Sequence, residues 1–232
     1  MKGARSRRHR RGSVGRRAIV GILATGLCAS AFGPAGSPAA LAATRQAAGG
    51  PASLARVLSI LRAEERSTFQ ADYALVGHSG AAPILYTVYH RYPDYRIVSP
   101  HTVALVLGAT GYMCMTGQAR PTCMKTSPID AESTIPVPGV IPEEQVDYLT
   151  ALQAGRLAGT TVSSSQRTVL GQHATCLILK QRSGAKVYDV TYCVTSKVVA
   201  YIGAATGALE LTHFSGSAAP SLFALPKGAV VS

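Results

Sequence analysis

The sequence lacks several features that would place it in common structural classes. The 232-residue chain has no uninterrupted run of 18 apolar residues, which argues against a transmembrane helix of ordinary length. Beyond residue 42 it has no internal repeat, no low-complexity segment and no run of basic residues. It also has no series of alternating strand and helix patterns. These absences argue against repeat architectures, parallel α/β folds and a nucleic-acid-binding surface.

The first 42 residues contain no acidic side chain but hold eight of the 23 lysines and arginines of the chain. An apolar run at 18–24 follows this basic start, and the small-residue sequence Ala40–Ala42 comes later. This order predicts a secretory signal peptide over residues 1–42, cleaved near Ala42. The remaining 15 basic residues stand against 11 acidic ones, so the mature chain carries a net charge of +4.

The same segment leaves two alternatives for export and anchoring. Arg16 and Arg17, just before the apolar run, also fit a twin-arginine signal. Cys28 would be the acylated residue of a lipoprotein, but Leu27 precedes it where lipoprotein signals have Gly, Ala or Ser. We therefore predict a free secreted, extracytoplasmic protein. Its mature part would consist of a flexible segment at 43–52 and a single domain over 53–232.

Residues 176–193 read CLILKQRSGAKVYDVTYC and predict a β-hairpin with a two-residue turn at Gly184–Ala185. With that turn, Cys176 lies opposite Cys193 at a non-hydrogen-bonded pair. The Cα atoms of such a pair are about 4.5 Å apart, a distance that a disulfide tolerates. The same register places Lys180 opposite Asp189 and separates an apolar face from a mixed one. We therefore predict a disulfide between Cys176 and Cys193.

The other two mature cysteines, Cys114 and Cys123, lie in the segment YMCMTGQARPTCMKT. They predict a second hairpin with its own disulfide, because an even cysteine count in a secreted chain favours full pairing. Met113, Met115 and Met124 in the same segment leave a copper(I) site as the alternative, since sulfur ligands are soft. We favour the disulfide, with no metal and no cofactor.

The remaining pattern indicates two helices and many strands. Apolar residues recur every three or four positions over 53–62 and predict a helix with Ser53 as its N-cap, and a second helix is expected from Pro142. Strands are expected at 69–75, 84–92, 95–99, 103–107, in the two cysteine hairpins, and at 160–169, 198–203 and 208–214. The fold class is therefore α+β, mainly β, with a large antiparallel sheet and two helices covering one face.

The segment Gly77–Ala81 is close to G-x-S-x-G, the turn that exposes the nucleophilic serine of α/β-hydrolases. Ser79, Asp189 and His213 also follow each other in the order of a hydrolase triad. However, too few residues precede Ser79 for the earlier strands and crossover helix, and no oxyanion loop is present. We therefore expect a polar turn here, with a serine hydrolase as the less favoured alternative.

Several segments occur in an order known from one superfamily: a first helix running into STFQADYAL, the hairpin YHRYPDYRIVS, the two cysteine segments and the tail SLFALPKGA. In these segments the mature chain resembles secreted actinobacterial members of the LolA-like superfamily, which includes LolA, LolB and the mycobacterial LppX and LprG lipoproteins. The resemblance implies a strongly curved, unclosed antiparallel barrel, with helices as a lid over a hydrophobic cavity. It also implies a non-enzymatic protein that binds the acyl chains of lipids or lipoproteins.

The resemblance assigns the apolar alternation of the strands to the concave, ligand-binding face, although the same residues would also suit a filled core. The implied site consists of Phe69, Tyr73, Leu75, Tyr86, Val88, Leu105, Leu107, Met113, Met115, Leu177, Leu179, Val190 and Tyr192, with Leu149 and Leu152 from the lid. The expected partner is a lipid or lipid-modified molecule, together with a membrane surface or an envelope protein. We expect a monomer that binds no nucleic acid. A ligand-free interaction or sensor domain is the alternative.

Overall fold

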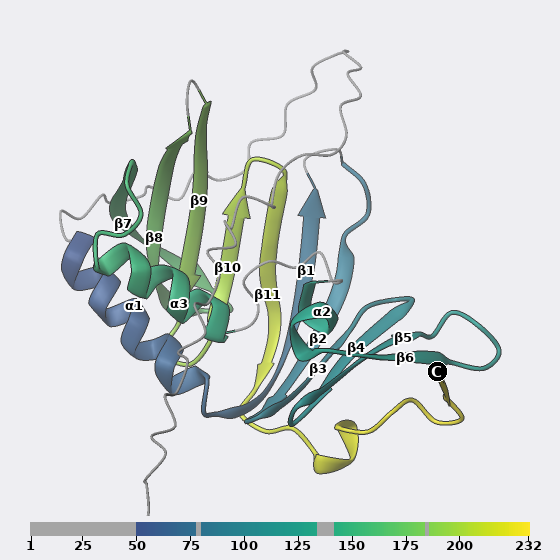
Figure 1. Ribbon diagram of the computed structural model, residues 1–232. Coiled ribbons are helices and arrows are strands. Elements are labelled where there is room, and N and C mark those ends of the chain that lie inside the picture. The colour runs from purple at the N-terminus through teal and green to yellow at the C-terminus, as the bar shows by residue number, and fades with distance from the viewer. Residues whose placement is uncertain (1–49, 78–79, 134–141, 184–185) are drawn as a thin grey trace, which may run out of the picture. The chain divides into compact units, whose positions relative to one another are not determined.

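The computed structural model describes residues 50–232 except 78–79, 134–141 and 184–185, all within the unit Ala43–Ser232 (Figure 1). The predicted signal peptide, Cys28, Ser79 and the turn at Gly184–Ala185 lie outside the described residues. Within the described part, no helix is both long and apolar enough to span a bilayer.

One sheet of 12 strands dominates the described part of the chain. The strands are β1 (Thr68–Gly77), β2 (Ile84–Arg91), β3 (Asp94–Val98), β4 (Thr102–Leu107), β5 (Thr110–Met115), β6 (Thr122–Thr126), β7 (Thr160–Val169), β8 (Gln172–Ser183), β9 (Lys186–Val194), β10 (Val199–Ala204), β11 (Gly207–Ser215) and β12 (Val230–Val231). Their order in the sheet is β12-β6-β5-β4-β3-β2-β1-β11-β10-β9-β8-β7, so β12 and β7 form the two open edges. The sheet is curved (Figure 1). Adjacent strands in it are antiparallel, apart from the parallel pair β12 and β6. The predicted fold class, mainly β with an unclosed sheet, is confirmed.

Among the described residues, three α-helices accompany the sheet: α1 (Gly50–Glu64), α2 (Pro128–Ser133) and α3 (Pro142–Gln153). Helix α1 packs against α3 and against β7 and β8, whereas α2 packs against β4 and β5. The prediction missed α2 and placed the start of α1 too late. Because α1 begins at Gly50, Ser53 lies inside the helix and is not its N-cap, and residues 50–52 belong to the fold. Pro51 suits this earlier start, since proline is well tolerated in the first helical turn.

The main core lies on the face of the sheet that carries the helices. From α1 it contains Leu54, Val57, Leu58 and Leu61, which recur at the spacing of one helical face. We call this side of the sheet the concave face. The reverse face carries two smaller buried clusters, one around each disulfide. A short 3₁₀ helix, η1 (Pro220–Leu222), belongs to the C-terminal tail, whose Leu225 and Ala229 pack against the cluster around Cys114 and Cys123.

Both predicted disulfides are present. Cys176 pairs with Cys193 across β8 and β9, and Cys114 pairs with Cys123 across β5 and β6, with Cα–Cα distances of 3.9 Å in each case. Lys180 lies opposite Asp189 as the register requires, with their charged atoms 3.9 Å apart. The second disulfide leaves no thiolate ligand at the β5–β6 hairpin for the copper(I) alternative. Disulfides of this kind form and persist in oxidising compartments outside the cytoplasm.

Gly111 in β5 is expected to be intolerant of any side chain. A Cβ atom there would collide with the carbonyl oxygen of Ser127, because the backbone entering α2 crosses directly over this strand. We expect Gly111→Ala to lower the free energy of unfolding by about 2 kcal/mol, in the range of overpacked core substitutions. Urea unfolding measures the effect. Gly216→Ala is the matched control, since a Cβ atom at Gly216 would meet no other atom within 4 Å; equal stability of both variants would contradict the close approach.

Candidate hydrophobic binding face

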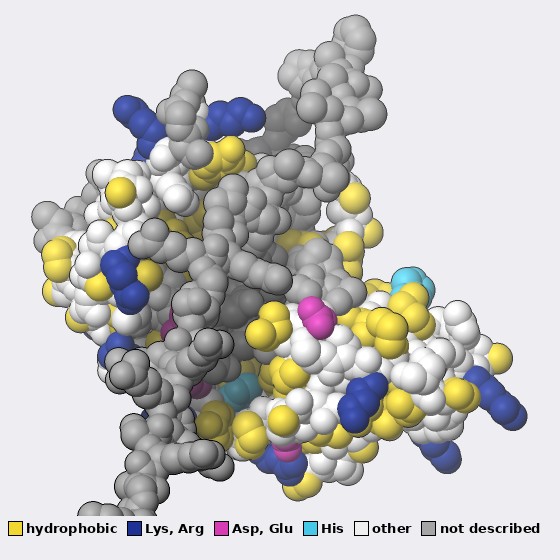
Figure 2. All heavy atoms as spheres, in the orientation of Figure 1, with side chains coloured by type: hydrophobic (Ala, Val, Ile, Leu, Met, Phe, Trp, Pro, Cys, Tyr) yellow, Lys and Arg dark blue, Asp and Glu magenta, His cyan; other side chains and the backbone are white. Residues whose placement is uncertain are grey.

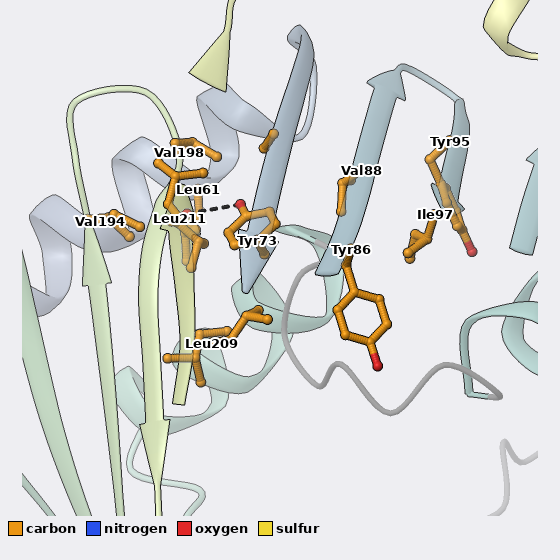
Figure 3. Packing of buried hydrophobic residues seen from close by; sticks show 14 of the residues in the cluster. Leu61, Tyr73, Tyr86, Val88, Tyr95, Ile97, Val194, Val198, Leu209 and Leu211 are labelled. Carbon is orange, nitrogen blue, oxygen red and sulfur yellow. Dashed lines mark hydrogen bonds between the residues drawn. The ribbon is translucent and has the colours of Figure 1, made fainter. Parts of the chain in front are cut away.

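Most of the residues predicted to line a ligand site do lie together on the concave face. Nine belong to the main buried cluster: Phe69, Tyr73, Tyr86, Val88, Met113, Leu149, Leu152, Leu177 and Leu179. Leu75, Val190 and Tyr192 are partly buried and pack against that cluster. Figure 3 shows how side chains from separate strands, Tyr73, Leu209 and Leu211 among them, gather into this cluster. Alternation along each strand accounts for this arrangement, because every second residue faces the helices.

Leu105 and Leu107 were assigned to the wrong face. Leu105 is fully buried on the reverse side with Cys114, and Leu107 packs against the same small cluster. Their neighbours Ala104 and Val106 face the helices instead. The error arises because β4 is apolar on both faces, so alternation along the strand cannot choose between them.

Met115 shares a face with Met113 but lies beyond the buried cluster. Its side chain is 49% exposed, and Met124, directly opposite Met113 on β6, is 58% exposed. Ile129 of α2 is more exposed still, at 74%. Hydrophobic side chains are visible in Figure 2 over the part of the sheet that carries β5, β6 and α2. The apolar surface therefore continues to solvent at this end of the sheet.

A second apolar extension lies at the paired ends of β1 and β2. Ile84 lies opposite Leu75, so both side chains belong to the concave face, and Ile84 is 44% exposed. The next residue, Leu85, lies opposite Ala74 and is on the reverse face. The concave face thus presents accessible apolar groups at Ile84, separate from those near α2. An accessible apolar surface that continues a buried one is typical of ligand grooves and interaction sites.

Glu64 is the most unusual polar residue of the concave face, and the prediction did not include it. It is the last residue of α1, it is 2% exposed, and neither carboxyl oxygen forms a hydrogen bond. Burial raises the pKa of Glu64 well above its ordinary value, and the nearby backbone of Val199 offsets only part of this shift. The carboxyl end of a helix also disfavours a negative charge. The position continues the buried spacing of Val57 and Leu61, which is the signal that could have revealed it.

Two other polar side chains lie close to this end of the face. The Tyr73 hydroxyl donates a hydrogen bond of 2.9 Å to the Val199 carbonyl oxygen (Figure 3). Burial, and secondarily the charge of Glu64, raises the pKa of Tyr73. The His90 ring stacks on Phe69 and its Nδ1 lies 2.8 Å from the Ser67 carbonyl oxygen; burial lowers the pKa of His90. These groups fix the junction between α1 and β1 to the sheet.

The residues of the hydrolase alternative are not assembled in the described part. Asp189 on β9 faces Lys180, and His213 on β11 lies 3.3 Å from Asp72 of β1, measured between Nδ1 and Oδ2. Strand β10 separates β9 from β11 in the sheet. Asp189 and His213 therefore serve different contacts, and Ser79 lies outside the described residues.

No known protein family and no curated protein matches the chain. Among solved structures, LprF from Mycobacterium bovis is similar over 78% of this chain and 99% of its own, with 11% identity and a TM-score of 0.44. MucB, solved in complex with MucA, is similar over 75% of this chain and 60% of its own, with 12% identity and a TM-score of 0.43. PNGF-II matches over 72% of this chain, with 10% identity and a TM-score of 0.39. The match spans only 30% of the PNGF-II chain.

Proposed function

We propose that the protein is a non-enzymatic extracytoplasmic binding protein whose concave face takes the acyl chain of a lipid or lipid-modified molecule. The observation that carries the proposal is the continuity of one apolar face beyond its helical cover. Buried residues under α1 and α3 lead to accessible apolar groups at Ile84 and near α2. A chain laid along this face would remove apolar surface from water, worth about 25 cal/mol per Å².

The helices α1 and α3 would act as the movable cover of this site. They pack against each other, and α1 reaches the sheet at β7 and β8. Leu177 and Leu179 on β8 are fully buried beneath this cover. A ligand that reaches them must displace the helices, so the proposal requires a second, open arrangement. The natural partners would be a membrane surface or an envelope protein that delivers or receives the lipid.

Native mass spectrometry of the mature protein from a secreting host tests the proposal. We expect a retained mass that leaves on solvent extraction and is identified as lipid. The same spectrum reports oligomeric state, for which we expect a monomer. A bare protein mass, together with no uptake of added fatty acid, would contradict lipid binding. That result would favour a ligand-free interaction domain with a filled core.

A charge placed on the accessible part of the concave face is expected to weaken binding. We expect Ile84→Glu to reduce the affinity for a fluorescent fatty acid at least about tenfold, because a carboxylate would have to be desolvated beside the acyl chain. Leu85→Glu is the matched control, since the adjacent side chain lies on the reverse face. Both positions are exposed enough to accept the substitution without unfolding. Equal losses of affinity in the two variants, or no loss of affinity in Ile84→Glu, would show that the ligand does not bind at this part of the concave face.

A further inference from the structure

A shallow, open pocket of about 530 Å³ lies at the carboxyl-terminal end of α1, beside α3. The described residues that line it are Arg62, Ala63, Glu65, Arg66 and Val146. Four of them come from the polar side of α1 and the turn that follows it, and Val146 comes from the first turns of α3. The pocket is thus formed where the two helices of the proposed cover meet.

The described lining of the pocket carries an excess of positive charge. Arg62 belongs to the last turn of α1 and Arg66 to the turn that follows the helix, and both side chains line the pocket. Glu65 reduces the formal charge of the lining to +1. The ion pairs seen between described side chains involve neither arginine. The two guanidinium charges exceed the partial negative charge of the helix end, which is about half an elementary charge. Guanidinium groups match phosphate, sulfate and carboxylate ligands through paired hydrogen bonds.

The pocket also adjoins the apolar face. Val146 lines the pocket and at the same time packs against the main buried cluster. On α1, Leu61 and Glu64 are buried at positions next to Arg62 and Glu65. Beside Val146, Gln145 is 4% exposed, and neither the nitrogen nor the oxygen of its side-chain amide has a hydrogen-bond partner. A pocket lined by two arginines therefore borders an apolar core in which the Gln145 amide has no hydrogen-bond partner.

We propose that this pocket binds the anionic headgroup of the amphiphile whose acyl chain the concave face takes. This inference rests on the proposed function and specifies its ligand class as anionic amphiphiles. Arg62 and Arg66 would hold the headgroup, and Val146 would mark the passage from headgroup to chain. Neutral amphiphiles would lack the charge-assisted contacts, and a zwitterionic phosphocholine would keep its phosphate but add a choline cation that the two arginines repel, so both would bind less tightly.

Calorimetry with two soluble probes of equal chain length tests the headgroup site. Myristoyl lysophosphatidylglycerol is anionic and myristoyl lysophosphatidylcholine is zwitterionic, and both are used below their critical micelle concentrations. We expect the wild-type protein to bind the anionic probe at least about tenfold more tightly, because the choline cation of the zwitterionic probe opposes the attraction of its phosphate to the two arginines. Added salt should reduce this preference, because the pocket is open to solvent.

The double variant Arg62→Gln/Arg66→Gln should lose the preference, because its affinity for the anionic probe should fall more than its affinity for the zwitterionic probe. Arg56→Gln, also an exposed arginine of α1 but outside the pocket, is the matched control and should behave as wild type. Arg62→Lys/Arg66→Lys should retain part of the preference, because it keeps the charge but not the paired geometry. Unchanged circular dichroism and thermal midpoints show that the variants remain folded.

The outcomes separate the headgroup site from the proposed function. If the double variant still prefers the anionic probe, the headgroup site is wrong while lipid binding stands. If the wild-type protein binds neither probe, both proposals fail. If it binds inorganic phosphate through Arg62 and Arg66 and does not distinguish the two lysolipids, the pocket is a site for free anions and the headgroup assignment is overturned.

Discussion

Glu64→Gln is expected to remove a large part of the pH dependence of folding stability. Relative to the wild-type protein, the variant should gain about 1.4 kcal/mol in free energy of unfolding for each pH unit above the ordinary pKa of a glutamate, until the folded-state pKa is reached. The glutamine has the same shape but never has to hold a charge in the apolar core. The effect is large because Glu64 is 2% exposed and has no hydrogen-bond partner for either carboxyl oxygen.

The sign follows from proton binding in the two states. Burial raises the folded-state pKa of Glu64 above its ordinary value of 4.5, so the folded protein keeps a proton that the unfolded chain has lost. The contribution of Glu64 to the free energy of unfolding is therefore fully present below about pH 4.5, and it is lost as the pH rises toward the folded-state pKa of Glu64. Burial lowers the pKa of His90 below the ordinary 6.5. The contribution of His90 to the free energy of unfolding is therefore lost as the pH falls, which is opposite in sign to the contribution of Glu64.

Urea unfolding of both proteins at several pH values between about 5 and 8 measures this prediction. The difference between the two curves cancels the contribution of His90 and leaves that of Glu64. Asp147→Asn, an exposed carboxyl-to-amide change on α3, is the matched control, and its stability should stay close to that of the wild-type protein. Parallel stability curves for wild type and Glu64→Gln would show that Glu64 ionises freely in the folded protein, and would contradict its burial.

Removal of the Cys176–Cys193 disulfide is expected to cost about 3 kcal/mol of stability, from the loop-closure entropy of a link between residues 17 apart in sequence. The cysteines are also buried on the reverse face with Ala174, and Tyr201 packs over them. The guanidinium of Arg167 lies 4.0 Å from the centre of the Tyr201 ring and covers this cluster in turn. Loss of the link would therefore loosen the reverse face of the β8–β9 hairpin as well as its register.

The double variant Cys176→Ala/Cys193→Ala tests this effect, because alanine leaves no buried hydroxyl or free thiol. Urea unfolding should show a lower midpoint with a similar slope. Cys114→Ala/Cys123→Ala is the comparison, and its loss should be smaller by about half a kcal/mol, since its cysteines are only 9 residues apart. If reduction of the wild-type protein leaves its stability unchanged, the disulfides do not contribute in this way.

The cysteine hairpins were predictable because their information is local. A turn of known length fixes the register, and the register alone decides that Cys176 faces Cys193 and Lys180 faces Asp189. The disulfide between Cys114 and Cys123 was predicted from the even number of mature cysteines and from the short loop between these two. Alternation likewise placed Tyr73, Tyr86 and Leu177 on the face that the helices cover, because the other side of each of these strands carries polar residues, such as Asp72, Thr87 and Lys180.

Strand β4 was not predictable in this way. Its sequence TVALVL is apolar at both the odd-numbered and the even-numbered positions, so the local pattern does not decide which side faces the helices. The choice depends on the C-terminal tail, whose Leu225 and Ala229 pack against the reverse cluster that contains Leu105. More than 100 residues of sequence separate Leu105 from that tail. Helix α2 was missed for a related reason, since six residues give too little periodicity to read.

Periodicity and spacing within a few residues were enough to predict most of the strands, the two long helices, the hairpin registers and both disulfides. Long-range packing was needed to establish which face of β4 meets the helices, that Glu64 lies buried without a partner, and that Arg62 and Arg66 line a pocket beside α3. Each of these features depends on contacts between elements far apart in the chain. Such contacts leave no periodic signal in any one segment, because the residues that surround a side chain in the fold belong to a different segment of the sequence.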